Sequence, residues 1–169
     1  MTIERDLEKI ALQEKRLQFK YFDADLAWTI GSNLKEAAEK RRAAAAIEIQ
    51  INGHTLFFFA MPGTSPDNAD WIRRKRNTVT RMHRSSYAIG LMNERDKTTF
   101  HAKTGAELRD FATHGGGFPI TMVGGTGCVG SIIVSGLPQR EDHMLIVSVL
   151  ADYFHIPPEE LALDAAAPA

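Results

Sequence analysis

The chain has very little cysteine: Cys128 is its one thiol in 169 residues, so no disulfide can form within it. A lone cysteine excludes a disulfide-stapled scaffold and is typical of a reducing compartment, so we expect a cytoplasmic protein. Long apolar runs are also missing, because the longest, such as residues 56–61, have only the length of a strand. The first ten residues carry charges where a secretory signal peptide needs an apolar run. We therefore expect no membrane partner.

An excess of charge of one sign is absent as well. Lys and Arg number 20 and Asp and Glu number 21, which gives a formal net charge of -1. Aromatic residues make up 8% of the chain and do not interleave with its basic positions, so no nucleic-acid partner is expected. The six histidines show no metal-ligand spacing, and no nucleophile motif is present. The sequence therefore predicts no metal site, and it leaves open whether the protein is an enzyme and which residues would be catalytic.

Hydrophobic periodicity predicts an α+β domain. Residues 47–51 alternate apolar and polar side chains, as a half-buried strand does, and Asn52-Gly53 predicts a type I′ turn into a return strand. Hairpins require an antiparallel sheet, and amphipathic helices must cover its faces, so a doubly wound parallel sheet is excluded. The patterns predict helices over residues 3–19, 23–43, 69–92, 107–113 and 138–154, and strands over residues 47–51, 54–61, 118–123 and 128–135.

The first 22 residues look separate from the rest. Residues 1–22 are expected to form an amphipathic helical arm, and residues 23–169 a single α/β domain. Ile3, Leu7 and Ile10 place an apolar stripe along the arm. Such a stripe has to be buried, so the arm lies either on its own domain or on a neighbouring subunit.

A glycine-rich segment matches the spelling of a dinucleotide-binding motif. Gly125 to Gly130 reads G-x-G-x-x-G, but that site needs a helix to begin at the third glycine. Residues 131–135 are strand-like instead, so a hairpin turn with close backbone packing is favoured over a nucleotide site. Cys128 lies in the same strand, where a cysteine is more often a small buried apolar residue than a nucleophile.

Two features are candidates for ligand binding. Residues 73–84 carry six Lys and Arg side chains and no carboxylate, which indicates either an anion site or a solvated helix face. His114 precedes Gly115–Gly117, and three consecutive glycines predict a loop whose backbone amides can face a ligand. The imidazole could ligate haem iron or act as an acid or base, and a loop histidine with no special role is the alternative.

Four segments in order resemble the GlcG-like, or haem-degrading-domain (HbpS-like), family. They are the hairpin 47–61, the helix around residues 75–85, Gly116-Gly-Phe-Pro-Ile120, and Gly127-Cys-Val-Gly-Ser-Ile-Ile-Val-Ser-Gly136, followed by an acidic helix start at Gln139-Arg-Glu-Asp142. The match covers roughly residues 24–154. The additional N-terminal helix and Trp71 resemble the branch of that family known as an uncharacterised protein family (UPF).

The resemblance implies a profilin-like, three-layer fold in which a sheet of about five antiparallel strands lies between helices, and it implies assembly into homo-oligomers. Some relatives bind haem or corrinoid-type ligands. This sequence departs from the common pattern in two places, with His114 before a third glycine and Phe118 where a smaller aliphatic residue is usual.

We predict an oligomeric protein that binds a small molecule, either haem or another anionic ligand, between residues 115–119, the 124–127 turn and the basic helix. The alternative is a non-catalytic structural or interaction protein acting as a homo-oligomer. If haem is the cofactor, His114 would be its axial ligand, and Arg76 or Arg81 would pair with the propionates. The predicted ligand-binding residues are Arg76, Arg81, His114, Gly115, Gly116, Gly117, Phe118, Pro119 and Gly125.

Overall fold

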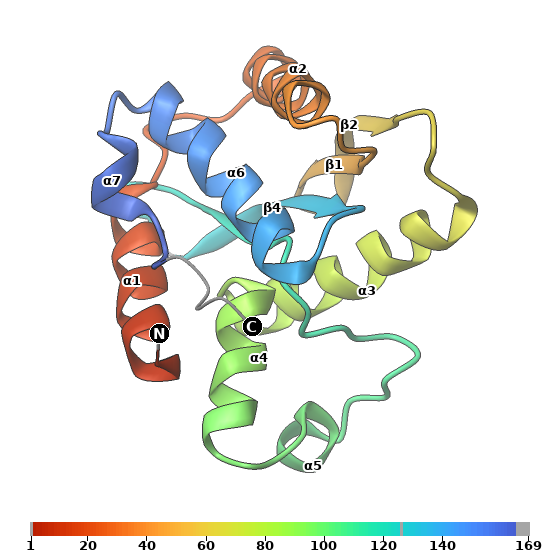
Figure 1. The fold of residues 1–169 in the computed structure, drawn as a ribbon, viewed down its shortest axis with the longest axis vertical. Coiled ribbons are helices and arrows are strands. Elements are labelled where there is room, and N and C mark those ends of the chain that lie inside the picture. The colour runs from red at the N-terminus through yellow and green to blue at the C-terminus, as the bar shows by residue number, and fades with distance from the viewer. Residues whose placement is uncertain (1, 126, 165–169) are drawn as a thin grey trace.

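The computed structural model describes residues 2–125 and 127–164 and has the expected α+β class (Figure 1). Its antiparallel sheet has the strand order β2-β1-β4-β3. The sheet formed by the described residues has four strands, where about five were expected. The strands are β1 (Ala46–Ile51), β2 (His54–Ala60), β3 (Gly117–Thr121) and β4 (Cys128–Ser135). The helices are α1 (Ile3–Arg16), α2 (Ala24–Lys40), α3 (Pro66–Met82), α4 (Ser86–Arg95), α5 (Phe100–Thr104), α6 (Gln139–Tyr153) and α7 (Pro158–Leu161).

The sheet lies between two helical layers. Side chains alternate between the faces of a strand, so Ile47 and Ile49 of β1 point toward α2 and α6. Their neighbours Ala46 and Glu48 point toward α3, where Ala46 packs with Ile72. Figure 1 shows α2 and α6 side by side and α3 apart from them. Burial on both faces confirms the layered arrangement that the sequence predicts.

The β1–β2 hairpin is the one that the sequence predicts. Asn52 and Gly53 have φ angles of 47° and 80°, and a type I′ turn needs positive values at both positions. The two strands pair antiparallel from Ala46 opposite Ala60 to Ile51 opposite His54, with one register irregularity after Ile49. Turn chemistry alone was enough to place this hairpin.

The predicted helix over residues 69–92 is wrong in its extent. His83 takes a left-handed conformation, with φ 55°, and ends α3, and the Ser85 side chain then caps α4 by accepting a hydrogen bond from the Ala88 amide. Residues 107–113 form no helix, whereas α5 and the short α7 were not predicted. Apolar residues are buried on both sides of the break, Val79 before it and Ile89 after it, so periodicity in the sequence does not detect it.

The two edges of the sheet differ. Phe19 covers the outer edge of β3: its amide donates to the Thr121 carbonyl at 2.9 Å, and its carbonyl accepts from the Val123 amide at 2.8 Å. No strand of the described residues pairs with the outer edge of β2. The Phe19 backbone therefore pairs with the end of one edge, whereas no strand of the described residues pairs with the other.

The N-terminal arm lies on its own domain. Ile10 is fully buried, and the buried Gln13 donates to the Leu161 carbonyl at 2.7 Å and accepts from Nε2 of His143 at 2.8 Å. Asp6 forms an ion pair with Arg140 at 2.6 Å. These contacts decide between the two positions that the sequence left open. Among the helices described, none combines the length and the hydropathy needed to cross a membrane.

Candidate functional site

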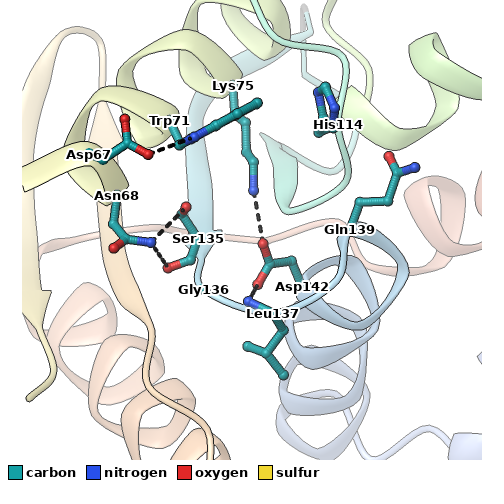
Figure 2. A pocket seen from close by; sticks show the side chains of 10 residues that line it. All are labelled: Asp67, Asn68, Trp71, Lys75, His114, Ser135, Gly136, Leu137, Gln139 and Asp142. Carbon is teal, nitrogen blue, oxygen red and sulfur yellow. Dashed lines mark hydrogen bonds and ion pairs between the residues drawn. The ribbon is translucent and has the colours of Figure 1, made fainter. Parts of the chain in front are cut away.

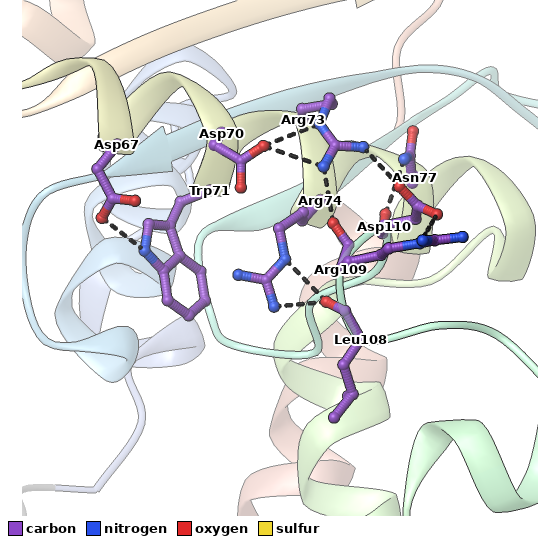
Figure 3. Close-up of polar contacts among 9 residues, drawn as sticks. All are labelled: Asp67, Asp70, Trp71, Arg73, Arg74, Asn77, Leu108, Arg109 and Asp110. Carbon is purple, nitrogen blue, oxygen red and sulfur yellow. Dashed lines mark hydrogen bonds and ion pairs between the residues drawn. The ribbon is translucent and has the colours of Figure 1, made fainter.

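The polar face of α3 holds an irregular segment in place. Arg74 donates to the Leu108 carbonyl through Nε and Nη2, at 3.0 and 2.6 Å, and Asn77 donates to the Asp110 carbonyl at 2.8 Å (Figure 3). Arg73 binds the Asp110 carboxylate at 3.1 Å and Asp70 on its own helix. Residues 108–112 are thereby fastened along α3, and they lead directly to His114.

The bend that follows is fixed through its backbone. The Ser86 hydroxyl donates to the His114 carbonyl at 2.5 Å and accepts from the Gly117 amide at 3.0 Å. The Gly115 amide donates to Oε1 of Gln139 at 3.3 Å. The expectation that bare amides of this loop face a ligand is therefore wrong for Gly115 and Gly117, since α4 and α6 supply their partners.

A buried ion pair lies beneath the bend. Nζ of Lys75 lies 2.9 Å from Oδ2 of Asp142 (Figure 2). The same atom donates to the Val134 carbonyl at 2.9 Å. Oδ1 of Asp142 accepts from the Leu137 amide at 2.9 Å. Burial lowers the pKa of Lys75 and raises the pKa of Asp142, and the ion pair opposes both shifts. The pair joins α3, the end of β4 and the first turn of α6.

The His114 side chain is partly exposed and lies where three hollows meet. A hollow of about 250 Å³ is lined by Trp71, Lys75 and Gln139 among others, and a second, of about 160 Å³, shares Gln139 and His114 with it. A third, of about 320 Å³, shares Thr113 and His114 with the second and includes Arg74, Leu108 and Phe111. We call these three adjoining hollows the His114 groove.

Neighbouring charges and rings surround His114 in the groove and favour its neutral form. Burial, followed by the charges of Lys75 and Arg74, lowers the pKa of His114, so its ring is neutral at neutral pH. Trp71 meets that ring edge-on at 4.8 Å, and the Arg74 guanidinium lies over the indole at 4.5 Å. Within residues 2–125 and 127–164, no side chain or carbonyl is hydrogen-bonded to a ring nitrogen of His114. The groove therefore offers an accessible neutral imidazole.

The two arginines predicted to bind a ligand are engaged elsewhere. Arg76 forms an ion pair with the buried carboxylate of Glu48 at 2.6 Å, on the sheet face that α3 covers. Arg81 donates to the Thr104 carbonyl at 3.0 Å and lies over the Phe111 ring. Neither lines the His114 groove, so placing them in one hollow with His114 needs correction. Residues 73–84 contain no carboxylate, but the partners of these two arginines lie on segments distant in the sequence.

The other predicted residues are also dispersed. Phe118 and Pro119 are buried within β3, and Gly125 lies in the turn after that strand. Gly116 packs so closely against β4 and Lys75 that a Cβ atom at this position would overlap the Val134 carbonyl oxygen. Among the described residues, His114 is the one predicted site residue whose side chain lines the groove.

Several groove residues were not predicted, and one pattern could have indicated them. Asp67, Trp71 and Lys75 are spaced four apart, so they share one face of α3. The Trp71 indole donates to Asp67 at 3.2 Å on that face. A tryptophan and a lysine on the same stripe of a polar helix indicate a functional or buried face, whereas nothing in the sequence places Arg74 beside His114.

The glycine-rich segment behaves as a hairpin. β4 begins at Cys128 and runs through Gly130, so no helix starts where a dinucleotide site requires one. The Cys128 thiol donates to the Gly130 carbonyl at 3.0 Å, and burial raises the pKa of that thiol. The start of β4 agrees with a hairpin turn in place of a nucleotide site. The raised pKa keeps the Cys128 thiol protonated, and a protonated thiol is a poor nucleophile.

Fold and groove together define an α+β domain with a histidine-lined groove beside the end of its fourth strand. The chain belongs to the family described as "Haem degrading protein HbpS-like", whose model matches residues 22–151. A UPF0303 protein of Azotobacter vinelandii is 58% identical over 97% of this chain and 98% of its own length. A UPF0303 protein of Serratia proteamaculans is 52% identical over 90% of this chain and 94% of its own length. These findings confirm the resemblance seen in the sequence.

Solved structures share the fold. Ybr137w superposes with a TM-score of 0.82 at 30% identity, over 88% of this chain and 87% of its own. A chain described as HbpS gives a TM-score of 0.62 at 21% identity, over 80% of this chain and 92% of its own. A structure described as a PduOC:Heme complex gives a TM-score of 0.65 at 16% identity, over 79% of this chain and 94% of its own. At these last two identities the likeness supports the fold alone.

Proposed function

We propose that this protein binds a small anionic ligand in the His114 groove, and that haem is the ligand to test first. The observation that carries the proposal is the accessible, neutral imidazole of His114 at the junction of three hollows. Neutral imidazole is the form that ligates iron, and its lowered pKa keeps it in that form at neutral pH. The family, and a structural neighbour that was solved as a haem complex, support the choice of ligand.

Arg74 takes the role first assigned to Arg76 or Arg81. Its Nε and Nη2 bind the Leu108 carbonyl, and Nη1 has no hydrogen-bond partner among residues 2–125 and 127–164. A ligand carboxylate at Nη1 would form a charge-assisted hydrogen bond, and such bonds contribute about 1.5–3 kcal/mol. The guanidinium is already positioned by the carbonyl and by the Trp71 ring, so little side-chain entropy would be lost on binding.

The shape of the groove sets how a large ligand would sit. The hollow on the Lys75 side, about 250 Å³, is smaller than the roughly 300–1,000 Å³ of drug-sized pockets. A ligand of porphyrin size would draw on residues of all three hollows, with His114 at their junction and Leu108 and Phe111 on the Arg74 side. The residues present fit the group in this respect: His114 would hold the metal, and Arg74 would hold an acidic substituent. Bound haem would supply iron chemistry at that position.

Hemin titration into the purified full chain tests the proposal. We expect a saturable Soret shift in the wild-type protein and its loss in His114→Ala, with no change in His54→Ala, which removes a histidine from the β1–β2 hairpin. Arg74→Met should weaken binding about tenfold or more, because it removes a charge-assisted bond. Arg81→Met should leave binding unchanged. Circular dichroism checks that each variant is folded.

Two results would contradict the haem assignment: no Soret shift in the wild type, or the same shift in His114→Ala. Native mass spectrometry of protein purified without added ligand separates haem from the wider proposal. An additional mass that disappears in both His114→Ala and Arg74→Met would identify a different anionic ligand in the same groove. If no mass and no hemin binding were found, the binding function itself would fail.

A further inference from the structure

We propose that the N-terminal arm, α1, is a pH-sensitive latch: it supports one wall of the His114 groove and leaves that wall when His143 takes up a proton. The regulation of ligand binding that follows rests on the proposed function, whereas the movement of the arm is tested without a ligand. Figure 1 shows α1 beside α7, and the Gln13 side chain joins these two helices.

The apolar side of the arm supports a wall of the groove. Its stripe packs against Tyr87 and Leu91 of α4, and Ile10 is fully buried in that contact. Tyr87 and Leu91 also line the hollow of about 160 Å³ within the groove. On the polar side of the same contact, Arg140 donates to the Tyr87 hydroxyl at 3.4 Å and to the Asp6 carboxylate of the arm at 2.6 Å. When the arm moves, both side chains of this wall lose their support.

His143 of α6 is hydrogen-bonded to the arm in surroundings that exclude water. Its imidazole is fully buried, and Nε2 donates to Oε1 of Gln13 at 2.8 Å. Nδ1 has no hydrogen-bond partner within the described part of the chain. A second proton on the ring would occupy Nδ1, where no acceptor receives it, and a buried donor without an acceptor is unfavourable.

The groups that face this imidazole also disfavour a positive charge. Tyr87 of α4 and Phe118 of β3 place their rings 5.3 and 6.0 Å from the His143 ring. Arg140 of α6 is itself a cation, and the arm's carboxylate at this contact, Asp6, is paired with it at 2.6 Å. Burial, followed by the charge of Arg140, lowers the pKa of His143 to about 3. Protonation becomes favourable once the arm is away and water reaches the ring.

The arm can leave without dismantling the core. Among the described residues, the apolar cluster between the sheet and helices α2 and α6 contains none from Ile3–Arg16. Leu17 and Phe19, which follow the arm, belong to that cluster, and Phe19 is fastened to the end of β3 by two backbone hydrogen bonds. A peripheral helix of this kind can open locally while the rest of the domain stays folded.

Release of the arm should depend on pH in a defined direction. With the arm docked, His143 has a pKa of about 3, and an imidazole that water reaches has one near 6.5. The docked form therefore has its full advantage above pH 6.5 and loses it as the pH falls toward 3. Between pH 7.5 and 5, the equilibrium constant for release should rise about thirtyfold.

Hydrogen exchange of the full chain at pH 7.5 and 5, corrected for the intrinsic exchange rate at each pH, measures this constant. Amides of residues 7–13 should open about thirtyfold more often at pH 5, and α4 amides of residues 88–91 should follow them. At each pH the arm should open more often than β1 and β4. In His143→Gln the rise should be at most about threefold, because the titrating group is gone. The matched control His54→Gln, at an exposed position of β2, should behave as the wild type.

Three results would overturn the latch. They are an arm that opens equally at both pH values, the same rise in His143→Gln, and an arm that opens no more often than β1 and β4. The last would mean that the whole domain unfolds. If α4 amides of residues 88–91 stay as protected as the strands while the arm opens, the arm does not support the groove wall, and the proposal equally fails.

Hemin separates this inference from the proposed function. At one hundred times its dissociation constant and pH 7.5, hemin should lower the opening constant of the arm at least tenfold, since a ligand that binds the docked form alone would lower it about one hundredfold. Bound hemin that leaves arm exchange unchanged would contradict a latch on the groove. If no hemin binds, the haem assignment fails, and the ligand-free exchange at pH 7.5 and 5 still decides the latch.

Discussion

Nζ of Lys75 and Oδ2 of Asp142 lie 2.9 Å apart, and neither residue is more than 3% exposed. The pair connects the middle of α3 to the first turn of α6, and the lysine also binds the Val134 carbonyl at the end of β4. Three segments distant in the sequence therefore meet at one charged contact on the floor of the hollow that His114 and Trp71 also line. A buried pair of this kind is costly to break from one side only.

Removing one partner of this pair should destabilise the fold strongly. We expect Lys75→Met to lower the free energy of unfolding by about 3–5 kcal/mol, because it leaves the Asp142 carboxylate buried without its counter-ion. Urea denaturation followed by circular dichroism measures the change. The double variant Lys75→Met/Asp142→Leu should recover much of the loss, since no uncompensated charge remains. The exposed Lys40, replaced by Met, is the control and should have little effect. A double variant no more stable than the single would contradict the electrostatic explanation.

Gly116 should tolerate no side chain. Its φ is 110°, and a Cβ atom would overlap the Val134 carbonyl oxygen and lie 2.8 Å from Nζ of Lys75. Gly53 also has a positive φ, 80°, but nothing lies within 4 Å of its Cβ position. Gly53→Ala should therefore cost about 1–2 kcal/mol for conformation alone, and Gly116→Ala clearly more, about 3 kcal/mol or above. Thermal unfolding of both variants makes the comparison. Equal losses would mean that close packing at Gly116 does not contribute.

The fluorescence of Trp71 should report the protonation of His114. The rings meet edge-on at 4.8 Å, and a protonated imidazole quenches a neighbouring indole. The variant Trp28→Phe leaves Trp71 as the single tryptophan of the chain. As the pH is lowered, its emission should fall with a midpoint below pH 6.5, because burial, Lys75 and Arg74 lower the pKa of His114.

Two further variants define that titration. The transition should disappear when His114→Ala is added to the Trp28→Phe background. Adding Arg74→Met instead should move the midpoint upward, because one of the positive charges that disfavour the imidazolium is removed. A midpoint at or above 6.5 in the parent protein would contradict the neutral imidazole on which ligand binding depends.

His143 should make stability depend on pH. Burial, with the nearby charge of Arg140, lowers its pKa from 6.5 to about 3, and the ring is hydrogen-bonded to Gln13 through Nε2. Below pH 6.5 the unfolded chain takes up a proton that the folded chain does not, so this contribution is complete above pH 6.5 and is lost as pH falls toward 3. Each pKa unit corresponds to about 1.4 kcal/mol, so the loss reaches a few kcal/mol.

Urea unfolding at pH 7.5, 6, 5 and 4 measures this dependence. His143→Gln keeps a hydrogen-bonding side chain opposite Gln13 and removes the titration. Its stability should decline less steeply between pH 6.5 and 4 than that of the wild type, while the carboxylates contribute alike in both proteins. Parallel profiles for the two proteins would exclude His143 as the source.

The site shows where sequence reasoning ends. His114 was predicted because a histidine before three glycines is unusual locally, and it lies in the groove. Arg76 and Arg81 belong to a run of cations, residues 73–84, that contains no carboxylate, yet Glu48 and the Thr104 carbonyl bind them from segments 28 and 23 residues away. Nothing in the sequence distinguishes Arg74 from its basic neighbours, although its guanidinium is the one beside the Trp71 ring. Which cation of a basic helix stays available depends on long-range partners that no local pattern records.

By itself the sequence determined what short-range physics controls: the I′ turn at Asn52-Gly53, the alternation in β1, the hairpin character of the segment after Gly124, and hence an antiparallel α+β domain. Tertiary structure decided the break at His83, the docking of the arm through Gln13 and the meeting of Lys75 with Asp142. Those outcomes depend on packing and pairing between segments far apart in the chain, where the partner of each buried polar group exists only after the layers have assembled.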